Sequence, residues 1–179
     1  MRIVITGTPG TGKTTVAAQI AKMLGLKLIL IKNIVEKNKI YTVENKEKIV
    51  DLEALAGLLK KMLKDEKNFV LEDHLACEIK IPTNHIFVLR THPVELKKRL
   101  SARGYKPEKL KENLLCEMLD YCVQRVMKIY GRRPIEIDTT KEKARSTALK
   151  IIKIIKNKKK KGDKVDYSKE LLRYLRLLR

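Results

Sequence analysis

The chain has no tryptophan, only 4% aromatic residues, and no run of about 18 apolar residues that would suit a membrane span. The N-terminal residues lack the order of charged, apolar and small residues that marks a signal peptide. Cysteine is scarce as well, and the three cysteines form no C-x-x-C pair and no recognised ligand spacing with the three histidines. These absences argue against a disulfide framework and a Cys/His metal site. We expect a cytoplasmic protein that does not enter a membrane.

Acidic residues are also in short supply relative to basic ones. Lysine and arginine number 41 against 21 aspartates and glutamates, which gives a formal charge of +20. Such a charge raises the local concentration of nucleotides, RNA or other polyanions, but it does not say which of them binds. The length of 179 residues suits one domain with a sizeable core.

A phosphate-binding loop is the strongest motif in the sequence. The segment GTPGTGKTT at residues 7–15 fits G-x-x-x-x-G-K-[ST], and it lies between an apolar strand pattern at 2–6 and a helix pattern that begins near Lys13. Glycines let successive backbone N–H groups point inward, and the helix N-terminus adds positive potential. Lys13 is then expected to reach the β- and γ-phosphates, and the Thr14 hydroxyl to bind Mg²⁺. The loop therefore predicts binding of a nucleoside triphosphate.

Apolar runs and helical patterns alternate along the rest of the chain. The sequence predicts strands at 26–31 (buried), 68–74, 85–91 and 133–138, and helices at 50–63, 92–105, 107–130 and 141–155. Residues 32–51 are polar with short apolar patches, which indicates an insertion or a lid. Regular alternation of this kind predicts a three-layer P-loop NTPase of the α/β class, with a five-stranded parallel sheet covered by helices on both faces.

The last segment, residues 157–179, differs in composition from the rest. It begins with the lysine-rich stretch NKKKKGDKVD, which is typical of a solvated linker. An amphipathic helix pattern follows, with leucines at 171, 172, 175 and 178 on its apolar side. Three interpretations stay open: a helix that packs on the body after a flexible spacer, an arm that binds RNA or the ribosome, and a segment that docks on a membrane surface.

Acidic residues end the predicted strand at 68–74, in the segment VLEDH. A P-loop protein usually holds Mg²⁺ with the help of an acidic residue at the tip of a neighbouring strand. Side chains alternate along a strand, so Glu72 is expected to face the cation and Asp73 to point away. His74 is expected to orient a water molecule or a substrate phosphate near the γ-phosphoryl group.

Two arginines end the next predicted helix, in the segment RLSARGYKPEKLKEN. Arg99 and Arg103 are four residues apart, and Gly104 follows directly. Arginines in this place are expected to close over the transferring phosphoryl group, with Gly104 allowing a lid to move. Phosphoryl transfer depends mainly on positioning and on such charge stabilisation.

Taken together, the segments GTPGTGKTT, VDLEAL, LEDH, VLRT and RLSARGYKPEKLKENLLCE resemble the adenylate kinase 6 family of archaea and eukaryotes over residues 1–156. The resemblance implies an adenylate kinase-like fold, reversible phosphoryl transfer between nucleoside triphosphates and monophosphates, and a separate ATPase activity. It also implies transient association with ribosomal protein uS11 during late maturation of the small ribosomal subunit RNA.

The resemblance further implies roles for individual residues. The triphosphate-binding residues are Gly10, Gly12, Lys13, Thr14 and Thr15, together with Arg103 of a lid at about 102–112. Glu72 and His74 match an acidic-x-His motif, although eukaryotic members carry aspartate at the first place. A monophosphate-binding region covers about residues 30–53 and is expected to act with a later arginine; its candidate residues are Ile34, Val50, Asp51 and Arg90. Residues 157–179 lie outside the resemblance.

The motifs and the resemblance together predict a nucleoside monophosphate kinase of broad specificity with Mg²⁺ as cofactor. The resemblance also implies an intrinsic ATPase activity and a role in small-subunit maturation, and the basic surface and tail suggest RNA contact. The alternative is an ATPase assembly factor whose hydrolysis releases a ribosomal protein or RNA. A shikimate kinase-type enzyme is disfavoured, because it would need an Asp-x-Asp arrangement where this chain has IKNIVEK. The short lid predicts more uncoupled hydrolysis than in a long-lid kinase.

Overall fold

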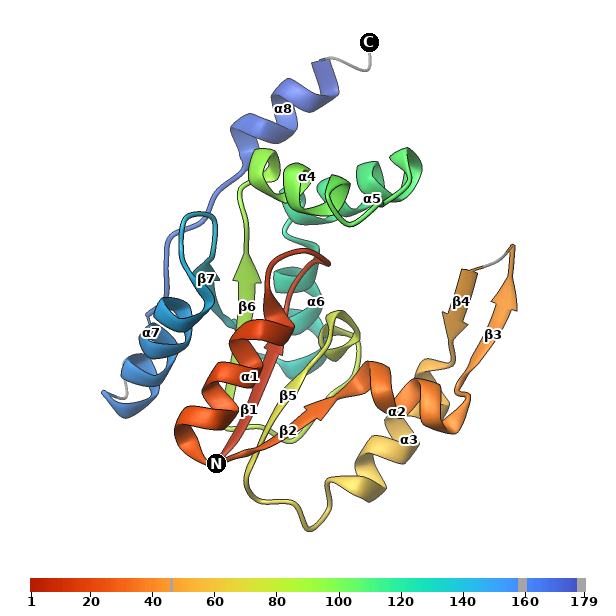
Figure 1. Cartoon of the computed structure of the whole chain (residues 1–179), viewed down its shortest axis with the longest axis vertical. Helices are drawn as coiled ribbons and strands as arrows, with labels where there is room; N and C mark the ends of the chain where they lie inside the picture. The colour runs from red at the N-terminus through yellow and green to blue at the C-terminus, as the bar shows by residue number, and fades with distance from the viewer. Residues whose placement is uncertain (46, 158–160, 177–179) are drawn as a thin grey trace.

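A computed structural model describes residues 1–45, 47–157 and 161–176. Its centre is a parallel sheet of five strands in the order β2-β5-β1-β6-β7 (Figure 1). The strands are β1 (Arg2–Thr6), β2 (Lys27–Leu30), β5 (Phe69–Glu72), β6 (His85–Arg90) and β7 (Ile135–Asp138). The register places Ile5 of β1 opposite Glu72 of β5. The predicted fold class is therefore confirmed, and the end of β5 lies directly beside the start of the phosphate-binding loop.

Helices cover both faces of the sheet, and the alternation of side chains along β1 explains why. Ile3 and Ile5 pack with α1 (Lys13–Leu24) and α7 (Ala144–Lys156) in one buried cluster. Val4 points the other way, into a second cluster with Leu55 of α3 (Leu52–Met62) and Val126 of α6 (Tyr121–Tyr130). Two apolar layers therefore hold the central strands from both sides, which fixes the edge where β1 and β5 end.

The segment expected to be an insertion forms a helix followed by a hairpin. Helix α2 (Ile31–Asn38) leads into β3 (Tyr41–Glu44), which pairs antiparallel with β4 (Glu47–Val50), and α3 follows directly. Asp51 caps α3, since its carboxylate accepts hydrogen bonds from the backbone N–H groups of Glu53 and Ala54, both at 3.0 Å. The hairpin projects away from the sheet (Figure 1).

Two predicted elements are corrected by the structure. The expected helix at 107–130 is broken into α5 (Pro107–Met118) and α6, because Asp120 adopts a left-handed conformation with φ of 54°. The four-residue apolar spacing continues across the break, so the pattern gave no sign of it. The strand expected at 26–31 is an edge strand rather than a buried one, and Leu28 of β2 is 36% exposed.

The region around the predicted lid is compact. Helix α4 (Pro93–Ser101) has Pro93 in its first turn, as predicted, and its chain turns through residues 102–106 into α5. Gly104 adopts a left-handed conformation with φ of 71°, so its place in the structure is to reverse the chain after α4. Residues 107–112 of the predicted lid belong to the first turns of α5. The rest of the predicted lid, residues 102–106, forms a turn between the two helices and is named here the lid turn.

The C-terminal segment packs against the body, and the described part of it is not a solvated linker. The Asp163 N–H donates to the Glu136 carbonyl at 2.9 Å, and an Asp163 carboxylate oxygen accepts from the Asp138 N–H at 2.8 Å. Tyr167 is 5% exposed and joins a third buried cluster with Leu96, Leu100, Leu114 and Met118. Helix α8 (Ser168–Arg176) follows and lies near α4 and α5 (Figure 1). Residues 158–160 and 177–179, including Leu178, lie outside the described residues.

None of the helices in the described ranges is long and apolar enough to cross a membrane.

Candidate active site

The phosphate-binding loop contains three glycines with a positive φ, a backbone conformation that other residues adopt only with strain. Gly7, Gly10 and Gly12 have φ values of 140°, 93° and 88°. A Cβ atom on Gly7 would come within 2.4 Å of the Leu89 carbonyl oxygen, and one on Gly10 within 2.8 Å of Leu96. A Cβ on Gly12 would meet nothing within 4 Å. The loop is therefore pressed against the core at its first two glycines and faces open space at the third.

Lys13 lies at the first turn of α1 with its side chain folded into the loop. It is 8% exposed, and its Nζ donates to the Thr8 carbonyl oxygen at 3.1 Å. Burial lowers the pKa of Lys13 from its usual value, while nearby Glu72 acts in the opposite direction. A phosphate anion in the loop would favour the charged form of this lysine, so the position suits a phosphate ligand.

Glu72 meets the loop from the end of β5. The Thr14 hydroxyl donates to its Oε1 at 2.8 Å, whereas its Oε2 is buried and has no hydrogen-bond partner among the described residues. Burial raises the pKa of the Glu72 carboxyl above its usual value. An orphaned carboxylate oxygen beside a threonine hydroxyl is the oxygen donor set that Mg²⁺ prefers, so these two residues fit a magnesium ion.

Asp73 and His74 form a second pair beside Glu72. His74 Nδ1 lies 2.9 Å from Asp73 Oδ1, which also accepts from the Leu75 N–H at 2.9 Å. Burial acts to raise the pKa of Asp73, but the hydrogen bond and charge of His74 outweigh it, and the pKa is lowered overall. The expectation that Asp73 points away from the site is wrong, since it lines the same cavity as Glu72.

These residues line a cavity of about 400 Å³, named here the P-loop cavity. Besides the loop and the β5 tip, it is lined by residues from α2, from the β4 hairpin and from the turn after α4. Four of its lining residues are cationic: Lys13, Lys32, Lys48 and Arg103. Of the predicted site residues, the cavity collects Gly10, Lys13, Thr14, Val50, Glu72, His74 and Arg103.

Lys32, Lys48 and Tyr105 line this cavity but were not selected from the sequence. Lys48 is held in place by Glu36, whose carboxylate oxygens lie 2.5 and 2.6 Å from its Nζ, and by the Tyr41 ring at 4.2 Å. Nothing in the lysine-rich segment distinguishes these two lysines from their neighbours. That Lys32 and Lys48 line the cavity could be recognised only from the buried face of α2 and the pairing of the hairpin strands.

Other predicted residues lie elsewhere. Arg99 donates through Nε to Glu95 at 3.1 Å and through Nη2 to the carbonyl oxygens of Thr139 and Thr140 at 2.9 and 3.1 Å. These contacts tie α4 to the segment after β7. Because the Arg99 guanidinium is engaged there, the prediction that Arg99 lies at the transferring phosphoryl group is wrong. Ile34 is a core residue at 8% exposure. Gly12 and the exposed Thr15 lie at the loop without lining the cavity.

Arg90 was expected to act with the monophosphate region, and the structure corrects this. The side chain is 1% exposed and bound on every side: Nε donates to Glu117 at 2.9 Å, Nη1 to Glu136 at 2.7 Å, and Nη2 to Asp120 at 2.5 Å. Burial works against its charge, but the carboxylates prevail and raise the pKa of Arg90 above its usual value. A guanidinium enclosed in this way has no face left for a substrate phosphate.

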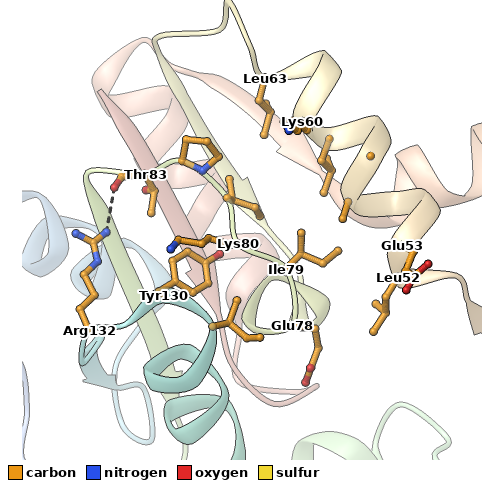
Figure 2. Close-up of a pocket in the computed structure, with 16 residues that line it drawn as sticks. Leu52, Glu53, Lys60, Leu63, Glu78, Ile79, Lys80, Thr83, Tyr130 and Arg132 are labelled. Atoms are coloured by element: carbon orange, nitrogen blue, oxygen red, sulfur yellow. Dashed lines mark hydrogen bonds between the residues drawn. The ribbon is translucent and has the colours of Figure 1, made fainter.

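A second cavity, of about 1000 Å³, is a different feature. It lies between α3, the segment at 78–83 and the end of α6. Figure 2 shows Ile79 and Tyr130 facing Leu52 of α3 and Leu63, the residue after α3, across it. The Arg132 guanidinium closes one end by donating to the Thr83 carbonyl at 3.0 Å (Figure 2). No P-loop residue lines it, so size alone does not identify the site.

Comparison with known proteins relates this arrangement to a family. A family model described as "AAA domain" matches residues 3–120, which contain the loop, the β5 tip and the lid turn. Two archaeal proteins, both named "Putative adenylate kinase", are similar over 99% of this chain and 98% of their own length. One is from Methanocaldococcus jannaschii at 38% identity, and the other is from Pyrococcus furiosus at 35% identity. The similarity extends into the C-terminal segment, beyond the limit at 156 inferred from motifs.

Among solved structures, shikimate kinase from Acinetobacter baumannii in complex with shikimate has a similar fold. The TM-score is 0.64 at 21% sequence identity, with 88% of this chain and 94% of that chain covered. At this identity the likeness shows the three-layer fold and no shared substrate.

Proposed function

Because this chain belongs to an adenylate kinase-like family of AAA-domain proteins, we propose that it transfers the γ-phosphoryl group of ATP to nucleoside monophosphates. In this reaction the bond between the γ-phosphorus and its bridging oxygen breaks, and a monophosphate oxygen takes its place. The observation that carries the proposal is the P-loop cavity, where the loop lysine meets three further cations from the inserted region and the lid turn. Phosphoryl transfer needs cations of this kind to stabilise the phosphate charges. Three carboxylates line the same cavity, and they are bound there by Lys48, Thr14 and His74: Glu36, Glu72 and Asp73.

Each side of the cavity has a part in this proposal. The loop N–H groups and Lys13 hold the β- and γ-phosphates, and the nearby start of the loop helix adds positive potential. Lys32 holds the phosphate of the acceptor, since it reaches the cavity from the inserted region. Lys48 reaches the cavity too, but Glu36 already binds its ammonium group, so it takes part only by exchanging that carboxylate for the phosphate. Exposed Arg103 lies over the cavity from the lid turn and stabilises the charge that spreads over the moving phosphoryl group.

Mg²⁺ is the cofactor of this proposal. Thr14 and Glu72 would hold it, directly or through water, and the ion would neutralise phosphate charge when bound. The Asp73–His74 pair orients the nucleophile: Asp73 fixes the His74 ring through Nδ1, which leaves Nε2 of this half-exposed side chain free to face the cavity.

Hydrolysis of ATP without an acceptor is the second activity that we propose. The turn at 102–106 passes directly from α4 to α5, so the lid is short and shields the γ-phosphate from water less than a long lid would. In the alternative that gives hydrolysis the main role, the same turnover releases a bound ribosomal protein or RNA. The two activities differ only in which oxygen nucleophile reaches the phosphorus.

Contact with ribosomal components in the cytoplasm is the most specific part of the proposal. Its support is the sequence resemblance, which implies transient association with uS11 and the small ribosomal subunit, together with the charge of +20. Sedimentation of the protein with small subunits, with and without ATP and at two salt concentrations, tests it. Failure to co-sediment at low salt would remove this part and leave the kinase proposal untouched.

The kinase proposal is tested by product analysis. Mg-ATP is supplied alone and then with AMP, CMP, UMP or GMP, and nucleoside diphosphate and free phosphate are scored separately, with Lys13→Ala as the blank. We expect diphosphate from at least one added monophosphate. Free phosphate with no diphosphate from any acceptor would refute the kinase and favour the ATPase alternative.

A further inference from the structure

Thr8 is a junction inside the phosphate-binding loop. Its carbonyl oxygen accepts from the Thr11 hydroxyl at 2.9 Å and from Lys13 Nζ at 3.1 Å. The residue is 1% exposed, so water cannot replace these contacts easily. Whatever fixes Thr8 therefore also fixes the resting place of the lysine that the loop offers to phosphate.

What fixes Thr8 is a carboxylate from outside the loop. The Thr8 hydroxyl donates a hydrogen bond to Oε2 of Glu117 in α5. Glu117 is 2% exposed and lies 109 positions after Thr8 in the chain. The other oxygen, Glu117 Oε1, accepts from Arg90 Nε at 2.9 Å and from the Thr91 N–H at 3.0 Å. Both oxygens are thus engaged, one by the loop and one by the end of β6.

This carboxylate is itself held rigidly. Arg90 is clamped by Asp120 and Glu136 as well as by Glu117, and the Tyr167 ring of the C-terminal segment lies 5.2 Å from its guanidinium carbon. Glu117 also belongs to the helix that follows the lid turn, so one side chain joins the loop to the element next to Arg103.

We propose that Glu117 is a positioning residue for nucleotide binding, which acts through the Thr8 hydroxyl to hold the phosphate-binding loop and Lys13 in their binding geometry. The proposal rests on triphosphate binding by the loop, and it does not depend on which acceptor is used. A buried, charged acceptor on a loop hydroxyl makes a strong and well-directed hydrogen bond, and small displacements of phosphate-binding groups are costly.

The experiment compares four single variants and one double variant by titration calorimetry with Mg-ATP, at a temperature well below each melting point. Glu117→Ala removes the acceptor, and Thr8→Val removes the donor while keeping the shape of the side chain. Glu117→Gln tests rescue, because its carbonyl can still accept from the Arg90 side while its amide N–H donates to the Thr8 hydroxyl. Glu136→Ala is the matched control, since Glu136 is also buried and binds Arg90 but makes no hydrogen bond with the loop in the part of the chain that the structure describes.

We expect Glu117→Ala and Thr8→Val each to weaken ATP binding by about tenfold to a hundredfold. Glu117→Gln should recover most of that loss. The double variant Glu117→Ala/Thr8→Val should bind no more weakly than the weaker single variant, because both changes remove one interaction. Glu136→Ala should lower the melting temperature and leave ATP affinity within about twofold of the wild type.

Additive losses in the double variant, or equal losses of affinity in Glu117→Ala and Glu136→Ala, would overturn the proposal and leave Glu117 a structural residue. If Glu117→Ala does not fold, an unchanged affinity in Thr8→Val overturns it equally well. If the wild-type chain binds ATP but forms no diphosphate, the kinase proposal is refuted, and the proposal for Glu117 can still be tested by ATP binding. A wild-type chain that binds no ATP refutes both.

Discussion

Replacing Arg90 by methionine should destabilise the fold strongly without a direct effect on substrate contacts. The guanidinium is 1% exposed, and the side chains of Glu117 and Glu136 that it binds are 2% and 7% exposed. Methionine keeps much of the volume but leaves these carboxylates without their buried cation. Removing one partner of a buried ion pair costs about 3–5 kcal/mol, because the remaining charge is then uncompensated.

The expected change in melting temperature follows from this free energy. For a chain of this size, 1 kcal/mol lowers the melting temperature by about 2–4 °C, so Arg90→Met should lower it by roughly 6–20 °C. Arg133→Met is the matched control: Arg133 also binds Glu136, at 2.9 Å, but its side chain is 70% exposed. A pair with one exposed partner contributes about 0–1 kcal/mol, which corresponds to a loss of at most about 4 °C.

Thermal unfolding followed by circular dichroism, with urea unfolding as a second measure, tests this reasoning. The double variant Arg90→Met/Glu136→Gln should recover part of the loss, since it removes one of the stranded charges. Equal shifts for Arg90→Met and Arg133→Met would refute the assignment. A normal melting temperature for Arg90→Lys together with a raised KM for the monophosphate would also refute the structural role of Arg90. That result would show that Arg90 binds the substrate.

Three further predictions concern the site and the C-terminal segment. The pKa of Glu72 is raised, so protons should compete with Mg²⁺ for its carboxylate as the pH falls through that raised value. The Mg²⁺ concentration needed for half-maximal turnover should therefore increase on acidification, and Glu72→Gln should abolish this pH dependence. Arg103→Ala should lower kcat for diphosphate formation by about 10³-fold, whereas Arg99→Ala should mainly lower the melting temperature. A larger loss of kcat in Arg99→Ala than in Arg103→Ala, measured in a steady-state assay, would show that the role given to the lid turn is wrong. Tyr167→Ala should cost about 3 kcal/mol in urea unfolding, because a buried ring is lost, while a change at Leu172, which is 58% exposed, should cost less than about 0.5 kcal/mol.

Much of the fold could be predicted because its signals are local. The strand at 2–6, the loop and the start of α1 are neighbours in sequence, and the order of glycines, lysine and threonine needs no distant contact to be recognised. The remaining parallel strands follow from apolar runs that alternate with helical patterns. The place of Glu72 at the end of β5 could also be predicted, because an acidic residue that ends a strand next to the loop strand has few directions in which its side chain can point.

The errors arose where distant groups decide the conformation. Leu119 and Asp120 interrupt a helix whose apolar spacing continues on both sides, and the Asp120 carboxylate binds a guanidinium 30 positions earlier in the chain. Arg90 was expected to bind substrate because it lies in VLRT, one of the segments that resemble a nucleotide kinase family. Its carboxylate partners lie 27 to 46 positions away, and nothing near it in sequence announces them.

Adjacent residues alone were enough to predict the phosphate-binding loop and a sheet between helices, because backbone conformation and side-chain periodicity depend on neighbours in the chain. Three features became known from the packing of distant residues: which of the many lysines line the P-loop cavity, the contact between Glu117 and Thr8 across 109 positions, and the place of the Tyr167 ring beside the buried Arg90. The physical reason is that burial and charge pairing depend on what the fold brings together, and ion pairs stabilise or destabilise a site according to surroundings that no local pattern specifies.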